Sequence, residues 1–226
     1  PGTYRIIHSA PSQRKLKTGT LHGNWFRITL ETPHPDQVIH ILERIKDHVP
    51  NFFGPQRFGR YLNNHQIGKL LITGHRSEAT TIMRHSHIPM TRRMYRLLED
   101  AYLSYLFNRV VNERIPQTGL LEGDITSRNG PTGPLYGRRL DLATAHQGII
   151  EAKVLSEEEL RLSDFPWDGS RRPMFVPLKG LAHRTGDNHI TFRFFLPKGS
   201  YATSVLREIA KEGFSPPSLS SFCAVS

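Results

Sequence analysis

The sequence is short of cysteine and of long apolar stretches. Cys223 is the one cysteine in 226 residues, so no intramolecular disulfide can form, and we expect a reducing, cytoplasmic location. Cys223 lies in a Ser-rich tail without the electropositive surroundings that make a thiol reactive, which argues against a cysteine nucleophile. No apolar run reaches the ~18 residues of a membrane span, so a membrane is not an expected partner.

Metal-ligand clusters and phosphate-binding loops are also missing from the sequence. Among 12 histidines the one close pair is His85 and His87, with no cysteine or carboxylate nearby, so we expect no metal site. No Gly-rich loop carries Lys and Ser or Thr at P-loop spacing, and no Gly-x-Ser-x-Gly elbow occurs. Nucleotide hydrolysis and acyl transfer are therefore not favoured.

Acidic residues are too few to balance the basic ones. The chain has 30 Lys and Arg against 20 Asp and Glu, a formal net charge of +10. Such a charge favours a polyanionic partner, and nucleic acid comes first because its backbone repeats phosphates at short intervals. One basic cluster alone could be a solvated surface, but the clusters together favour nucleic acid. They are Arg14-Lys15-Lys17, Arg57 with Arg60, Arg92-Arg93-Arg96, Arg138-Arg139 and Arg171-Arg172.

Hydrophobic patterns predict strands near both ends of the chain and helices between them. Alternation predicts a strand at 22–30, with Phe26, Ile28 and Leu30 on one face, and another at 190–196. The predicted helices are 35–48, 63–73, about 91–113 after the N-cap Thr91, and one that opens at Gly199-Ser200. The sequence also predicts strands at 4–8 and 174–178, a helix from 138, and a capping box of Ser156 and Glu159; residues 75–90 show no clear pattern.

Two loops combine glycine, aromatic and basic residues. They are Gly23 to Phe26 and Asn51 to Gly59. Glycine lets a backbone approach a ligand closely, aromatic rings can stack on bases, and arginine binds phosphate. The same aromatic residues could equally anchor a core at a domain junction, so the spacing alone leaves both interpretations open.

Four motifs, in order along the chain, resemble the tRNA pseudouridine synthase D (TruD) family. Arg14 to Gly19 followed by His22 to Phe26 resembles the family's "KLxxGxxxGNxF" strand, and Val49 to Gly59 resembles "VPNYFGxQRFG". Leu106 to Val111 resembles "LFNxxV", and Leu196 to Glu208 resembles "LPxGSxATxxxRE". Over 60–190 the resemblance thins to scattered positions.

The resemblance implies an α+β fold, in which a mostly antiparallel pseudouridine-synthase-type sheet with helices is interrupted by an inserted α-rich (TRUD) domain. Residues 1–58 and 186–226 would form a partial, discontinuous catalytic domain, and 59–185 the insertion. The implied activity is the isomerisation of uridine 13 in the D arm of tRNA to pseudouridine by an Asp nucleophile. It needs no cofactor, and tRNA is the implied partner.

The resemblance also implies site residues. Phe26 would stack on the flipped base, Asn24 would help to hold the region of the aspartate, and Tyr201 would lie beside the same cleft. The expected RNA contacts are Arg14, Lys15, Lys17, Phe53, Arg57, Arg60 and Lys198.

The chain departs from the family pattern at the nucleophile. The family's Gly-x-Lys-Asp motif is absent, and none of the eight aspartates follows a Gly-x-Lys; they are Asp36, Asp47, Asp100, Asp124, Asp141, Asp164, Asp168 and Asp187. We therefore assign no nucleophile. The chain could lack an N-terminal segment of the enzyme, be a shortened relative, or receive the aspartate from a second polypeptide. A non-catalytic basic RNA-binding protein, or a structural component of a ribonucleoprotein, is the alternative.

Overall fold

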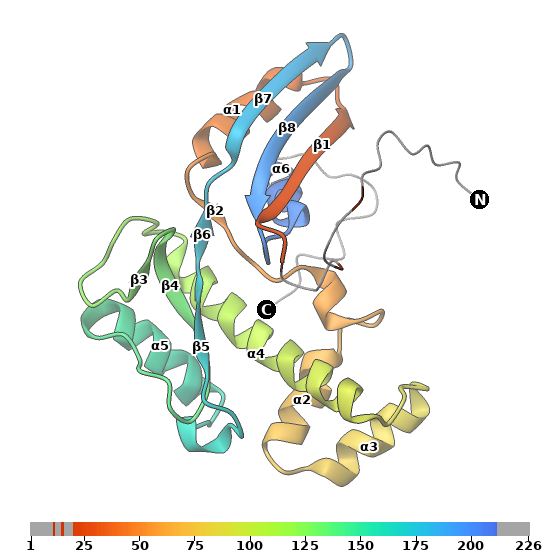
Figure 1. The fold of residues 1–226 in the computed structure, drawn as a ribbon, viewed down its shortest axis with the longest axis vertical. Coiled ribbons are helices and arrows are strands. Elements are labelled where there is room, and N and C mark those ends of the chain that lie inside the picture. Colours follow the sequence, from red (N-terminus) through yellow and green to blue (C-terminus); the bar gives the residue numbers. More distant parts are fainter. Residues whose placement is uncertain (1–10, 12–14, 16–19, 212–226) are drawn as a thin grey trace.

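The computed structural model describes residues 11, 15 and 20–211, and Figure 1 shows a sheet half above a helical half. Arg14, Lys17, the strand expected at 4–8 and the Ser- and Pro-rich tail lie outside the described residues. The two halves draw on different parts of the sequence, since the sheet combines strands from near both ends.

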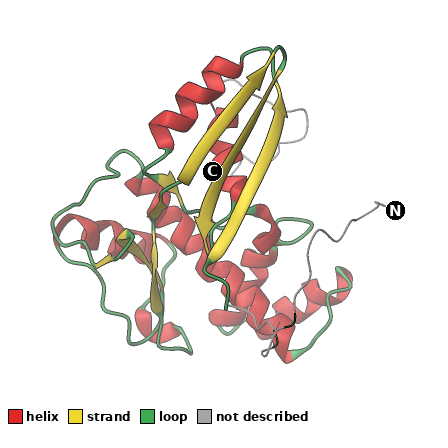
Figure 2. Ribbon diagram, turned by 45° about the horizontal axis from the view of Figure 1, so that its top comes forward, coloured by secondary structure: helices red, strands yellow, loops and turns green. Residues whose placement is uncertain are grey.

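The sheet half contains three antiparallel strands with two helices on one face (Figure 2). The strands are β1 (Gly23–Glu31), β7 (Lys179–Gly186) and β8 (His189–Pro197), in the order β1-β8-β7, and the helices are α1 (Pro35–Ile45) and α6 (Ala202–Lys211). Phe192 and Phe194 of β8 are fully buried against Leu42 and Val205 from these helices. The predicted strand at 22–30 and its inward face are confirmed, because alternate residues of an antiparallel strand meet the core.

The helical half surrounds one long helix. Its helices are α2 (Asn64–Ile72), α3 (Arg76–His85), α4 (Arg92–Arg114) and α5 (Ala145–Glu157), with 3-10 turns at Pro55–Phe58 and Leu162–Asp164. A small sheet contains β3 (Thr126–Ser127), β4 (Gly130–Leu135) and β5 (Ser170–Pro173). The predicted cap of α4 is confirmed, because the Thr91 hydroxyl accepts a hydrogen bond from the Met94 backbone at 3.2 Å. Phe107 of α4 is fully buried in the core of this half.

The chain enters and leaves the helical half at one place. Strand β2 (Val49–Pro50) pairs with β6 (Phe175–Val176), and the backbone N–H of Asn51 donates to the Met174 carbonyl at 2.8 Å. The layout of a sheet interrupted by a helical insertion is therefore confirmed. The division at 58 and 185 stays a prediction; because β7 pairs with β8, the strand pairing favours an exit from the insertion near Val176.

Several local predictions are wrong. The helix expected from 138 begins at Ala145, because the backbone N–H of Arg138 instead bonds the Trp167 carbonyl at 2.8 Å. The proposed capping box fails because Ser156 lies in the last turn of α5 and Glu159 takes a left-handed φ of 57° after it. The expected 174–178 strand is shortened to Phe175–Val176 (β6), because only these residues pair with the short strand β2.

Candidate active site

The start of β1 places two of the expected cleft residues. Asn24 and Phe26 are two positions apart, so both side chains leave the strand on the same side. The ring of Phe26 is half-buried and stacks on Phe194 of β8, with centroids 5.7 Å apart. Asn24 lies opposite Leu196 and is exposed. One end of the sheet therefore presents an amide group next to an aromatic ring.

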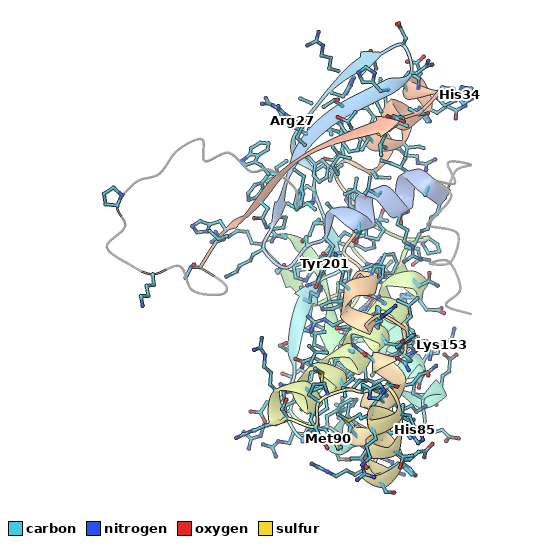
Figure 3. The ribbon with its side chains drawn as sticks, turned by 90° about the vertical axis from the view of Figure 1, so that its right-hand side faces the viewer. Arg27, His34, His85, Met90, Lys153 and Tyr201 are labelled. Carbon is cyan, nitrogen blue, oxygen red and sulfur yellow. The ribbon has the colours of Figure 1, made fainter. Side chains whose placement is uncertain are left out.

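The end of β8 lies beside the start of β1 and leads to the third cleft residue. The backbone N–H of Lys198 donates to the His22 carbonyl at 2.9 Å, which fixes this crossing. Gly199 follows with φ +83°, a left-handed conformation that favours glycine, and Tyr201 comes just before α6. Figure 3 shows Tyr201 at the level where the sheet half meets the helical half.

The Asn51–Gly54 loop is held at the same junction by side chains from both halves. Asn108 of α4 clamps Phe53, since its Oδ1 accepts from the Phe53 N–H at 2.8 Å and its Nδ2 donates to the Phe53 carbonyl at 3.0 Å. Ser204 of α6 donates to the Phe52 carbonyl at 3.2 Å. A Cβ on Gly54 would lie 2.9 Å from Thr203 Oγ1, so glycine permits this close approach to α6.

Arg172 joins this loop to the segment before α6. Its Nη2 donates to the Asn51 carbonyl, to Asn51 Oδ1 at 2.9 Å and to the Gly199 carbonyl at 2.8 Å. The guanidinium carbon lies 4.1 Å from the ring centroid of Phe53, and that of Arg57 lies 5.2 Å from the same centroid. The site therefore brings two guanidinium groups to one aromatic ring.

The charge of Arg172 is not balanced by a carboxylate within the described chain. Burial lowers the pKa of Arg172 to about 10; the nearby Tyr201 opposes this shift, and Arg57 adds to it. A buried cation without an anionic partner is unfavourable unless hydrogen bonds or a bound anion compensate it. The junction is therefore suited to an anionic ligand such as a phosphate.

The other expected RNA contacts differ in how far their side chains are exposed to solvent. Lys15 and Lys198 are exposed, and the exposed Arg60 lies over the ring of Tyr61 at 5.8 Å. Phe53 is only 8% exposed, and its ring also meets the edge of Phe107 at 5.5 Å. A direct contact of Phe53 with RNA stays a prediction, and these surroundings favour an indirect role through the guanidinium groups above it.

The eight aspartates all lie in the described part of the chain. There, none of them forms a hydrogen bond or ion pair with Asn24, Phe26 or Tyr201. Asp124 is buried and forms an ion pair with Arg114 at 2.7 Å, and the other seven cap turns, pair with surface arginines or face solvent. Sequence reasoning assigned no nucleophile, and the described structure offers no replacement.

Sequence reasoning missed Arg172 and Asn108 as individual site residues. In the sequence, Arg172 is one member of the basic cluster Arg171-Arg172, and Asn108 is one position of the Leu106–Val111 motif. Asn108 could have been found because it is a polar residue in a helical segment of core residues, directly after the buried Phe107.

The described part of the chain offers neither a cluster of metal ligands nor a membrane-spanning helix. No group of three or more His, Cys, Asp or Glu residues there could hold a metal ion. No helix there combines the length and apolarity needed to cross a membrane.

Comparison with solved structures defines the class of fold. The crystal structure of a protein from Methanosarcina mazei, described as a tRNA pseudouridine synthase D, matches with a TM-score of 0.69 and 23% identity. The match covers 88% of this chain and 71% of that one. The α+β architecture of this chain is therefore the fold of that protein, in agreement with the fold that the sequence motifs imply.

Sequence comparison identifies the family. The model of the tRNA pseudouridine synthase D (TruD) family matches residues 3–91 and 125–209, so this chain belongs to that family. A relative from Methanopyrus kandleri, described as a tRNA pseudouridine synthase D, is 32% identical over 277 residues, covering 91% of this chain and 69% of the relative. One from Anaeromyxobacter dehalogenans is 32% identical over 247 residues, covering 92% and 67%. The Leu106–Val111 motif lies between the two matched regions.

Proposed function

We propose that this chain acts on tRNA as a pseudouridine synthase and that its target is uridine 13 of the D arm. The observation that carries the proposal is the convergence of three family motifs at one end of the sheet. The start of β1, the Asn51–Gly54 loop and the segment from Gly199 to Tyr201 meet there. Family membership and the excess of basic residues support the same substrate.

The reaction is an isomerisation, so it needs no outside reactant. The bond from ribose C1′ to N1 of uracil breaks, the base turns, and a bond from C1′ to C5 forms; C5 loses its proton and N1 gains one, so the atoms balance. The target must leave the stack to be reached, which requires an aromatic platform and cations for the backbone. Phe26 supplies the ring for the base, Asn24 and Tyr201 border it, and Arg57 and Arg172 attract a phosphate. Arg14, Lys15, Lys17, Arg60 and Lys198 extend the RNA contacts.

The nucleophile distinguishes this function from a second candidate. Because no described aspartate contacts the junction, the chain alone could bind tRNA without modifying it. In the proposed enzyme the carboxylate comes from a segment or polypeptide outside this chain. A pseudouridine assay on unmodified tRNA, with site mapping, separates the candidates: product at uridine 13 from the 226-residue chain would assign the nucleophile to one of its eight aspartates.

Phe26 provides the sharper test. In whichever form of the protein makes pseudouridine, Phe26→Ala should abolish or strongly reduce the product while tRNA affinity persists, because the base loses its platform. Phe26→Leu is the matched control for folding, since it keeps apolar contact with Phe194 without a flat ring. Full activity of the alanine variant would exclude the stacking role.

A further inference from the structure

One face of the β1-β8-β7 sheet is not covered by any described element. Helices α1 and α6 pack against the face that carries Phe26 and Phe194, and strand alternation directs the neighbouring side chains to the opposite face. Figure 3 shows Arg27 on the side of the sheet away from these helices. Between β1 and β8 the outward rows are Trp25 with Phe195, Arg27 with Arg193, Thr29 with Thr191, and Glu31 with His189.

Trp25 lies across this face with most of its indole in solvent. It is 63% exposed, although its ring also meets the edge of Phe195, with centroids 5.8 Å apart. A Cβ on Gly180 of β7 would lie 2.7 Å from Trp25 Cη2, so the indole reaches across β8 and rests on a glycine. Gly180 has φ +64°, which also favours glycine. The neighbouring strands therefore support one part of the indole and leave the rest open.

Arg27 and Arg193 face each other across β1 and β8. Like charges on directly opposed residues of an antiparallel pair destabilise a sheet. Both side chains are exposed, and neither forms a hydrogen bond or ion pair with another described residue. Arg184 of β7 adds a third exposed guanidinium beside Thr191 in the next row. Glu31 lies in the last outward row, but none of these three arginines forms an ion pair within the described chain.

The composition of the face favours RNA over an apolar partner. Apart from Trp25 and Phe195, the outward rows carry arginine, threonine, Glu31 and His189, so a protein or lipid surface that needs apolar contact would meet mostly charged and polar groups. Single-stranded nucleic acid offers both a base to stack on an indole and phosphates for guanidinium groups. We propose that this uncovered sheet face binds a single-stranded segment of RNA, with Trp25 stacking on a base and Arg27, Arg193 and Arg184 contacting phosphates. The proposal rests on the proposed function and adds an RNA contact outside the cleft.

Trp25 fluorescence tests the stacking directly. The chain has two tryptophans, so Trp167→Phe leaves Trp25 as the only one. Titration with a short unstructured oligoribonucleotide should quench its emission saturably. Trp25→Phe is the matched control, in which Trp167 alone should not respond. If Trp167→Phe does not fold, subtracting the emission of the Trp25→Phe variant from that of the unsubstituted protein gives the emission of Trp25.

Affinity measurements test the whole face. Trp25→Ala should weaken binding of the same oligoribonucleotide by about fivefold or more, the usual effect of losing one stacked base. Arg27→Gln with Arg193→Gln should reduce the slope of log affinity against log salt by about 1.4. The thermal midpoint of that double variant should stay unchanged or rise, because the repulsion is relieved. Arg84→Gln, an exposed arginine of α3, is the control and should change neither quantity.

Three outcomes would overturn the proposal. They are unchanged emission with RNA, unchanged affinity and salt slope in the double variant, and Trp25 emission that is already blue-shifted and shielded from acrylamide before RNA is added. The last would mean that protein covers the face. Pseudouridine formation in tRNA is measured separately, so a sheet face without RNA affinity beside Phe26-dependent product would reject this proposal and leave the proposed function standing.

Discussion

At the scale of single residues, Arg172 connects the two halves of the molecule. Its Nη2 donates to groups of Asn51 and to the Gly199 carbonyl, while its guanidinium covers Phe53. These acceptors belong to segments 121 and 27 positions away in the sequence. No local pattern could have assigned this role, because a pair of adjacent arginines looks the same whether it is solvated or buried.

Arg172→Ala should destabilise the protein by about 2 kcal/mol, because it leaves the two acceptors of the buried Asn51 without this donor. The stability of Arg172→Lys should fall between that of the unsubstituted protein and that of Arg172→Ala, since an ammonium group keeps the charge but lacks the planar guanidinium fork. Urea denaturation gives the free energies of unfolding. Arg84→Ala is the control, expected within about 0.5 kcal/mol of the unsubstituted protein; a loss equally small for Arg172→Ala would contradict the role of Arg172 as a junction residue.

At the scale of elements, Glu158 links three helices of the helical half. At the end of α5 its carboxylate accepts from Lys69 of α2 at 2.7 Å, and from Tyr102 and Arg109 of α4 at 2.8 Å each. Burial alone would raise the pKa of Glu158, but these donors outweigh it and lower the pKa. His65 of α2 lies nearby, stacked on the ring of Tyr105 at 4.7 Å.

The pH dependence of stability should reveal His65. Burial lowers the pKa of His65 below its usual 6.5, so the unfolded chain takes up a proton that the folded chain does not. The free energy of unfolding should therefore fall as the pH drops below about 6.5 and until the lowered pKa is passed. His65→Phe keeps the ring packing without titrating, and its urea midpoint should vary less over this range. Equal slopes for both proteins would show that His65 does not contribute.

Glu158 acts in a lower pH range. Because its pKa is lowered in the fold, its contribution is present above about 4.5 and is lost as the pH falls through the folded pKa. Because His65 acts below about pH 6.5 and Glu158 only below about pH 4.5, one titration of stability against pH distinguishes their contributions.

The elements that the sequence predicts well are those with a strong period or a cap. β1, α1, α4, β8 and α6 follow from alternation, helical spacing and Thr91. α3 escaped prediction because it buries only Ala79 and Met83, too few apolar positions for a helical period. The cleft residues came from motif resemblance, whereas their convergence depends on contacts between distant segments such as Ser204 with Phe52.

At the scale of the whole molecule, positive charge is present on both halves. Arg57 and Arg172 lie at the junction, Arg27 and Arg193 on the sheet, and Arg92 to Arg96 at the start of α4. A tRNA extends over several such groups at once, so its affinity should depend steeply on salt.

Arg57→Ala should lower tRNA affinity and reduce the salt slope by about 0.9, the contribution of one phosphate contact with duplex nucleic acid. Filter binding at a series of salt concentrations measures both. Arg84→Ala serves as the comparison on a part of α3 outside the proposed contacts. If the slope of the Arg57 variant equals that of the unsubstituted protein, Arg57 is not a phosphate contact.

The pairing of β1 with β8 has a consequence for the protein as it is being made. Glu31 of β1 pairs with His189, and about 160 residues separate them. At ribosomal rates of about 5–20 residues per second, β1 waits roughly 8 to 30 s before its partner strand is synthesised. During that interval the edge that β8 later occupies and the apolar side chains of β1 lack these partners. Nascent chains should therefore engage chaperones while the helical half is being translated, and slowing the ribosome over α4 should increase aggregation.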